Sequence, residues 1–154
     1  MSVDPAMSDE AAYFAVRQLC AEWARRVDHD QGRRVEELFV PDGVYESDGR
    51  RTVGAAAIRA AYESRVARGP RVSRHLFSNL LVLPGTPLRS SSVMVLYARD
   101  GSGPMPPQLC LVADVADEYV WQDGQLLLVS RALTTVFVDD VNPPVFGFGA
   151  DQPE

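Results

Sequence analysis

The chain has 154 residues, 46% of them apolar and 23% charged, so it is expected to form one globular domain and not a disordered or fibrous chain. Its net charge of −6, with 15 arginines and no lysine, leaves no basic face and argues against nucleic acid and anionic membranes as partners. No apolar run approaches the roughly 20 residues that span a bilayer, and no secretory signal opens the chain. Two cysteines are too few for a disulfide scaffold, so a cytoplasmic location is expected.

The N-terminal third of the chain is predicted to be mainly helical. Ser8 is followed by two acids, which is typical of a helix start, and apolar residues then recur at steps of three and four up to Val27. The helix is expected to end near residue 29. Residues 33–39 are predicted to form a short second helix and residues 54–66 a third, closed by a Gly-Pro pair.

The rest of the chain is predicted to form strands. After a turn, residues 44–47 form a short strand between the second and third helices. Four longer runs rich in Val, Leu, Tyr and Ser follow, at residues 72–83, 90–99, 108–122 and 125–138. Asp123-Gly124 indicates a tight hairpin between the last two. This order indicates an α+β domain over residues 9–140, with three N-terminal helices on one face of a curved antiparallel sheet. Residues 1–8 are expected to be disordered and residues 141–154 to form an extended tail.

Three helices cannot cover both faces of a sheet of this size. We therefore expect the outer face to be covered by a second copy of the chain, in a homodimer.

Asp28 and His75 are the main candidates for chemistry. Asp28 lies at the border of the apolar stripe, where the first helix ends, and His75 lies in the first of the four long strands. A carboxylate and an imidazole facing each other are suited to acid/base catalysis, and burial would raise the pKa of Asp28 towards that of a useful base. The alternatives are a solvated aspartate at a helix end and a core histidine bonded to the backbone.

Asp28 and His75 are predicted to line one pocket, and other side chains are predicted to line it with them. By alternation, Phe77, Asn79 and Leu81 share the strand face of His75, with Phe77 and Leu81 as the apolar wall. Tyr45 is a candidate catalytic residue because it follows the turn that the first helix covers. The remaining candidates for substrate binding are Ser47, which shares a face with Tyr45; Tyr62, on the third helix; and Tyr97 and Glu118, on later strands whose inward faces are left open. No spacing of His, Cys, Asp or Glu indicates a metal site, and no cofactor is expected.

Five segments together resemble a known family. They are residues 27–30 (VDHD), 38–45 (LFVPDGVY), 53–58 (VGAAAI), 74–79 (RHLFSN) and the closing stretch from Asp123-Gly124 to Ser130-Arg131. In this order they resemble the SnoaL-like group of the nuclear-transport-factor-like folds. The group includes scytalone dehydratase, steroid isomerase, limonene epoxide hydrolase, polyketide cyclases and the small subunit of ring-hydroxylating dioxygenases. The resemblance implies a cone-shaped α+β barrel, a homodimer or larger assembly, and a deep apolar pocket.

The resemblance also implies roles for individual residues. Asp28 resembles the helix carboxylate of scytalone dehydratase that orients a histidine or a water, and His75 resembles the histidine that polarises a substrate oxygen. The second histidine of that enzyme has no counterpart here, and Arg99 and Tyr97 lie nearest to its place. The implied function is a cofactor-free dehydratase, isomerase or cyclase of secondary metabolism, acting on a hydrophobic oxygenated small molecule. The alternative is a non-catalytic ligand-binding or assembly protein, since residues 91–99 resemble a strand of the dioxygenase small subunit.

Overall fold

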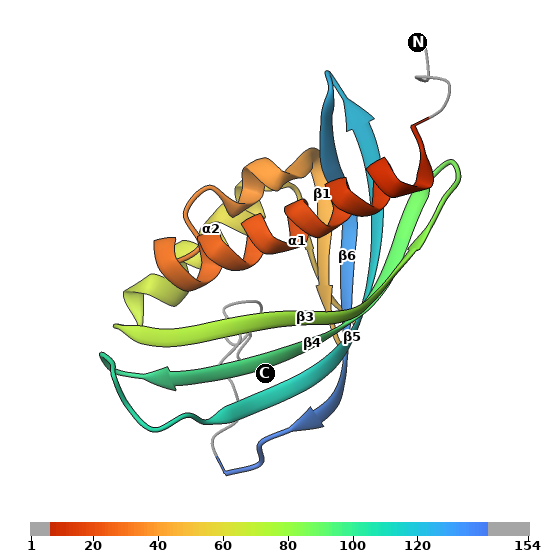
Figure 1. Cartoon of the computed structure of the whole chain (residues 1–154). Helices are drawn as coiled ribbons and strands as arrows, with labels where there is room; N and C mark the ends of the chain where they lie inside the picture. Colours follow the sequence, from red (N-terminus) through yellow and green to blue (C-terminus); the bar gives the residue numbers. More distant parts are fainter. Residues whose placement is uncertain (1–6, 142–154) are drawn as a thin grey trace.

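The computed structural model describes residues 7–141, which form a layer of helices on one side of a curved sheet (Figure 1). In chain order the elements are α1 (Asp9–Asp30), the 3-10 helix η1 (Val35–Leu38), β1 (Phe39–Ser47), β2 (Arg50–Val53), α2 (Ala55–Ala67), β3 (Arg71–Leu83), β4 (Leu88–Asp100), β5 (Leu109–Gln122) and β6 (Gln125–Val138). The α+β class is confirmed. Most of the predicted N-terminal disorder and C-terminal tail falls on residues 1–6 and 142–154, outside the described residues.

Helix α1 begins and ends close to where the sequence predicts. The Ser8 side chain accepts a hydrogen bond from the Ala11 N–H at 3.2 Å, which satisfies one of the unpaired donors of the first turn. Val16 and Trp23 are buried on the side that faces the sheet. The helix ends at Gln31, whose backbone is left-handed (φ 58°).

The prediction of three α-helices is wrong, because the described residues contain two. Residues 33–39 were expected to form a helix, but only the 3-10 turn Val35–Leu38 is present. Gly32 (φ 79°) and Arg34 (φ 65°) both have left-handed backbones just before it, and β1 already begins at Phe39. Too few residues remain between that turn and the strand for an α-helix to form.

The sheet has the strand order β2-β1-β6-β5-β4-β3 and is mixed and unclosed. The expected curved sheet is present, but it is not purely antiparallel, and its edges do not meet to complete the expected cone-shaped barrel. Strand β1 pairs with β6 in parallel, with Tyr45 opposite Arg131, while the other neighbours are antiparallel. The short strand β2, which we did not predict, covers the free edge of β1. The predicted hairpin is confirmed, since Asp123 (φ 52°) and Gly124 (φ 75°) join β5 to β6.

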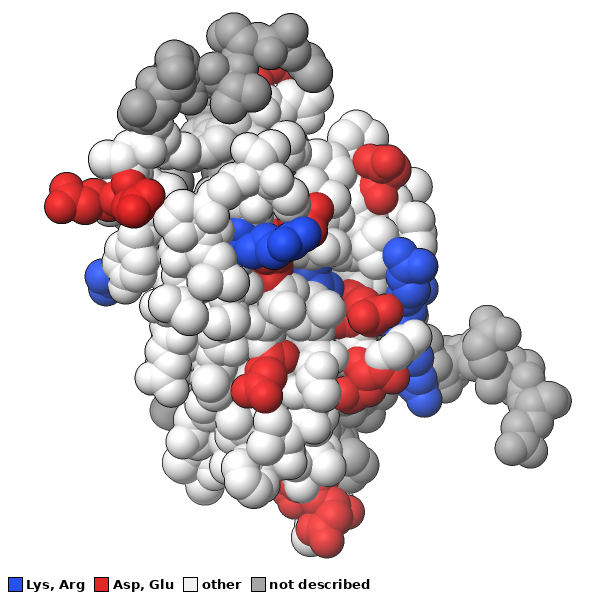
Figure 2. All heavy atoms as spheres, turned by 90° about the vertical axis from the view of Figure 1, so that its right-hand side faces the viewer, with Lys and Arg blue, Asp and Glu red and all other residues white. Residues whose placement is uncertain are grey.

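The sheet has an inner face, covered by α1 and α2, and an outer face without helices (Figure 1). The core side chains come from the two helices, η1 and the inward positions of the strands. No helix within residues 7–141 is long and apolar enough to cross a membrane. In Figure 2, acidic and basic side chains of the described residues are interspersed among uncharged ones. No continuous basic patch covers that side.

A bulge in β3 changes which side chains face inwards. His75 and Phe77 point to the inner face, but the pairing with β4 shifts between Ser78 and Leu81, where Asn79 has a φ of 52°. The alternation therefore restarts one residue later, and Leu81 is 57% exposed. The prediction that Asn79 and Leu81 share a face with His75 is wrong for this reason.

Candidate active site

Asp28 and His75 form a direct hydrogen-bonded pair. The last turn of α1 lies over β3, and Asp28 Oδ1 is 2.6 Å from Nδ1 of His75. Asp28 Oδ2 accepts the backbone N–H of His75 at 2.8 Å, and the hydroxyl of Ser73 donates to Oδ1 at 2.7 Å. The side chains of Asp28 and His75 are 4% and 10% exposed. Both carboxylate oxygens are thus occupied by donors, all of them on β3.

This geometry reverses the expected shift of the Asp28 pKa. Burial alone would raise the pKa of this carboxyl group, but the hydrogen bonds and charge interaction with His75, aided by Ser73, outweigh burial and lower it. Asp28 is therefore a carboxylate at neutral pH and a poor base. An ionised Asp28 keeps a proton on Nδ1 of His75, so Nε2 is the nitrogen that can take up a further proton.

Trp23 lies at the centre of the inner face and contacts three aromatic candidates. Its ring meets the His75 ring edge to face at 5.2 Å and the Phe77 ring at 5.8 Å, and it stacks on Tyr45 at 6.3 Å. Trp23 is only 1% exposed. These contacts hold the imidazole on one side while Asp28 holds it on another.

Tyr45, Ser47 and Tyr62 are buried with the same core. Burial raises the pKa of both tyrosines, so their hydroxyls are protonated at neutral pH and able to donate hydrogen bonds. Tyr62 packs over Gly32, where a Cβ atom would overlap its ring. The tight turn after α1 therefore helps to fix Tyr62.

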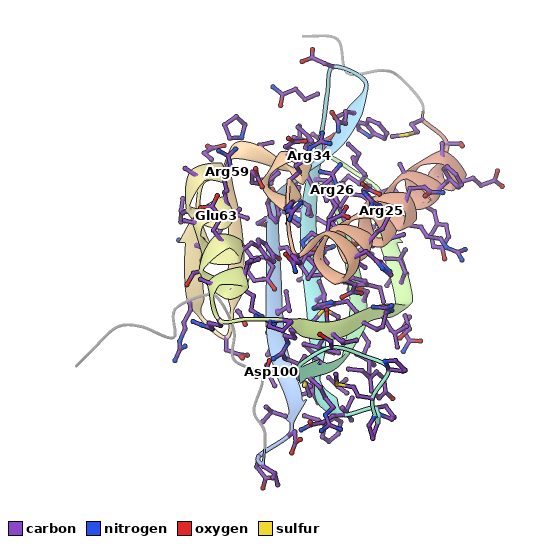
Figure 3. The ribbon with its side chains drawn as sticks, turned by 90° about the vertical axis from the view of Figure 1, so that its left-hand side faces the viewer. Arg25, Arg26, Arg34, Arg59, Glu63 and Asp100 are labelled. Carbon is purple, nitrogen blue, oxygen red and sulfur yellow. The ribbon has the colours of Figure 1, made fainter. Side chains whose placement is uncertain are left out.

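A network of ion pairs fixes the end of α1 that carries Asp28. Arg26 binds Glu22 at 2.8 Å and donates to the backbone oxygen of Arg34 at 2.6 Å. Arg25 binds Glu22 at 2.9 Å and Asp30 at 2.8 Å. Figure 3 shows Arg25 and Arg26 on α1 beside Arg34, with Arg59 on α2 to one side. The network ties α1 to the loop that follows it.

The other three predicted substrate-binding residues lie away from this site, on the outer face. Tyr97 is 39% exposed, because Leu96 and Ala98 take the inward positions of β4. Glu118 pairs with Arg89 at 3.3 Å on the outer face, since Asp117 and Tyr119 point inwards. Asn79 lines a shallow outer depression of about 370 Å³, whose other walls are Ser91, Ser92, Val93, Asp114, Val115, Ala116, Ala132 and Thr134.

A buried polar network on the inner face was missed. Arg131 is 0% exposed and binds Asp117 through Nε at 3.0 Å and through Nη2 at 2.8 Å. The hydroxyl of Tyr119 donates to Asp117 at 2.9 Å and lies 2.8 Å from that of Ser90. An arginine and an aspartate within apolar strands were a visible signal. However, counting back from the Asp123-Gly124 hairpin pairs Asp117 with Ser130, and only a bulge at Glu118/Tyr119 brings it opposite Arg131.

No group of three or more His, Cys, Asp or Glu side chains within residues 7–141 is arranged to hold a metal ion. Cys20 and Cys110 are both buried free thiols. Nη2 of Arg131 lies 3.3 Å from Cys20 Sγ, and burial raises the pKa of this thiol. A protonated, enclosed thiol is a poor nucleophile. The imidazole of His75 and the hydroxyls of Tyr45 and Tyr62 are suited to proton transfer and hydrogen bonding.

Comparison with known proteins agrees with this fold. The profile of the SnoaL-like domain family matches residues 9–132. Among curated proteins, none matches the sequence. A protein from Catenulispora acidiphila, solved in complex with S-DNPA, is 24% identical, with a TM-score of 0.72 over 82% of this chain and 95% of that one.

Two structures from Novosphingobium aromaticivorans are also similar. A proposed scytalone dehydratase is 18% identical, with a TM-score of 0.71 over 94% of this chain and 97% of that one. The beta subunit of a proposed aromatic-ring-hydroxylating dioxygenase is 15% identical, with a TM-score of 0.69 over 84% and 92%. At these identities the likeness establishes the fold alone.

Proposed function

Since the chain belongs to the SnoaL-like domain family, we propose that it is a cofactor-free acid/base enzyme that acts on a hydrophobic, oxygenated small molecule. Dehydration, isomerisation and ring closure all fit, and each begins with removal of a proton from carbon. The observation that carries the proposal is the 2.6 Å contact between Asp28 and His75 in a largely buried setting. Removing two ionisable side chains from water costs free energy, so the stability of the fold does not by itself explain why this pair is buried.

His75 is the proton acceptor in this mechanism, and Asp28 orients it. Nε2 takes a proton from the substrate, and the carboxylate of Asp28 stabilises the imidazolium that forms. Trp23 and Phe77 provide apolar surface beside the imidazole, and Tyr45 and Tyr62 provide protonated hydroxyls as hydrogen-bond donors. Acid/base positioning of this kind accelerates a reaction by about 10²- to 10⁴-fold.

A small-molecule substrate also fits the family comparison. A similar protein was solved in complex with S-DNPA, and the inner face of this chain carries apolar and aromatic side chains beside His75. The two buried free thiols also fit the cytoplasmic location that the proposal includes.

The test is proton exchange in heavy water with a panel of aromatic and alicyclic ketones, including 1-tetralone. We expect the protein to catalyse replacement of the ketone's protons next to the carbonyl by deuterium, and His75→Ala to abolish this exchange. His29→Ala is the matched control, because His29 is exposed at the end of α1 and touches none of the site residues named above. The proposal would be contradicted if a folded His75→Ala protein still catalysed the exchange. It would also be contradicted if the wild-type protein catalysed exchange in none of the ketones.

The second candidate is a non-catalytic assembly subunit. It is favoured by the fold shared with the dioxygenase beta subunit and by the large apolar side chains exposed on the outer face of this sheet. Under this reading, Asp28→Asn and His75→Ala would leave the assembled complex active. Co-purification with a larger subunit, unaffected by either substitution, would identify this function.

We also propose that the outer face joins two copies of the chain. Large apolar side chains point outwards from neighbouring strands: Leu76 (51% exposed), Leu81 (57%), Tyr97 (39%), Val120 (39%) and Phe137 (67%). Leu76 and Phe137 belong to one apolar row across the sheet, with Val95 and Val112 between them, and a contiguous apolar patch is typical of an interface. Sedimentation at tens of micromolar should give a dimer, and Leu81→Arg should give a monomer. A monomeric wild-type protein would end this proposal.

A further inference from the structure

A row of polar side chains crosses the inner face over four neighbouring strands. Tyr45 on β1 lies opposite Arg131 on β6, Arg131 lies opposite Asp117 on β5, and Asp117 lies opposite Ser90 on β4. All four are buried. A stable apolar core does not require a row of buried polar side chains, so these four residues are candidates for a role other than folding.

The guanidinium of Arg131 is held rigidly in this row. Asp117 binds two of its nitrogens, Nε and Nη2, and Cys20 accepts from Nη2. The ring of Trp23 lies 4.9 Å from the guanidinium carbon, and the ring of Phe77 lies 4.8 Å from it. An arginine held by a bidentate carboxylate and two rings cannot swing out towards water.

The third nitrogen of this guanidinium, Nη1, differs from the other two in its hydrogen bonding. It is buried and has no hydrogen-bond partner among the described residues. A buried donor without a partner is costly, and such groups in native proteins commonly await a water or a ligand. Phe77, which covers one face of the guanidinium, is two residues from His75 on the same strand face. Nη1 of Arg131 therefore lies near His75, the proposed proton acceptor.

We propose that Nη1 of Arg131 binds the carbonyl oxygen of the substrate, an inference that rests on the proposed function and names its substrate as a neutral, enolisable ketone. When Nε2 of His75 removes the proton, the C–H bond breaks and its electron pair forms a carbon–carbon double bond. The π electrons of the carbonyl move to the oxygen, and Nη1 donates a hydrogen bond to the enolate so formed. No oxidant or second reactant is needed.

The charges around Arg131 favour a ketone over a carboxylate. Asp117 already neutralises the guanidinium, and Asp28 adds a second carboxylate on the same inner face. A carboxylate ligand would bring a third negative charge into a site with one arginine. A neutral carbonyl oxygen accepts a hydrogen bond from Nη1 without that repulsion. Nη1 is closed to solvent, so a side chain beside it has to move for a ligand to reach it, and Phe77 is the most exposed of the side chains that contact the guanidinium.

The test compares three compounds of similar shape: 1-tetralone, its hydrocarbon tetralin, and 1-naphthoate. We expect the wild-type protein to bind 1-tetralone about tenfold more tightly than tetralin, because a hydrogen bond from a charged donor is gained, and to bind 1-naphthoate weakest. The ¹³C signal of a labelled tetralone carbonyl should move downfield on binding. Arg131→Met should abolish both the preference and the shift. Arg89→Met, on the outer face, should leave both unchanged.

A second variant covers the case in which Arg131→Met fails to fold with Asp117 left unpaired. The double variant Arg131→Met, Asp117→Asn removes both charges, and it should bind tetralone and tetralin equally. Equal binding of the two by the wild type would mean that Nη1 holds an internal water only, and would overturn the assignment. So would a preference that persists in the double variant, or a wild type that binds none of the three compounds.

Proton exchange on the same tetralone separates this inference from the proposed function. Exchange that depends on His75, without any preference for the ketone, would overturn the role of Arg131 and leave the acid/base function standing. A preference that depends on Arg131, without exchange, would support the oxygen site and refute proton abstraction.

Discussion

Replacing Asp28 by asparagine is expected to invert the tautomer of His75 while leaving the fold intact. Asp28 accepts three hydrogen bonds, from Ser73 and His75 Nδ1 on one oxygen and from the His75 N–H on the other. The amide oxygen of asparagine can still accept the backbone N–H, and its NH₂ group then faces Nδ1 and the serine hydroxyl. Nδ1 must become an acceptor, so the ring proton moves to Nε2, the position that has to be free to act as a base.

The size of each effect follows from these contacts. The hydrogen bonds are kept but lose their charge assistance, which is worth about 1–3 kcal/mol of unfolding free energy in total. Turnover should fall by about 10²- to 10⁴-fold, far more than the change in stability accounts for, because the base is in the wrong protonation state.

The measurement combines nitrogen-15 spectra of the two histidine rings, thermal melting, and proton exchange with 1-tetralone. Asp123→Asn is the matched control, since Asp123 is exposed in the β5–β6 hairpin, away from His75, and asparagine also tolerates its left-handed backbone. A folded Asp28→Asn protein whose His75 keeps its proton on Nδ1, or which exchanges protons at the wild-type rate, would refute the proposed role of Asp28.

Three further outcomes are expected. The pKa of Asp28 is lowered in the folded chain, so the stability that its charge contributes is complete above the ordinary carboxyl pKa and is lost as the pH falls through the lowered value. The difference in melting temperature between wild type and Asp28→Asn should therefore shrink below about pH 4. Arg131→Met leaves the buried Asp117 without its counter-charge and should cost about 3–5 kcal/mol in denaturant unfolding, whereas removing both charges should cost clearly less. Gly32→Ala places a Cβ at a φ of 79° and against the ring of Tyr62, so it should lower stability by at least about 1 kcal/mol, whereas Gly49→Ala (φ 83°), where nothing lies within 4 Å, should cost only the backbone strain. Equal melting temperatures for these two glycine variants would contradict the packing argument.

The contact between Asp28 and His75 was predictable because local patterns place each residue on the face of its element that packs against the other. The helical stripe places Asp28 at its border, and strand alternation puts Ser73, His75 and Phe77 on one face, so Ser73 was also within reach of the sequence. Asn79 was misplaced because one left-handed residue resets the alternation, and the hydrophobic pattern carries no sign of a single dihedral angle.

Glu118 and Tyr97 were misplaced for a related reason. On β4 and β5, both faces carry polar and apolar residues, so alternation alone does not say which face is buried. The parallel pairing of β1 with β6 was also out of reach, because no local signal links strands so far apart in the chain. Arg131 could not be linked to the site until that pairing and the β5 bulge were known.

The parallel pairing of β1 and β6 has a consequence for the order in which the protein is assembled during synthesis. Strand β1 leaves the ribosome early, but one of its two neighbours in the sheet is the last strand of the domain to be made. Until β6 emerges, Tyr45 has no Arg131 beside it and Asp117 has no counter-charge, while α1 and β3 can already bring Asp28 to His75. The acid/base pair can thus form during translation, whereas the polar row that crosses the sheet is completed only at the end, by contacts between distant parts of the chain that form slowly.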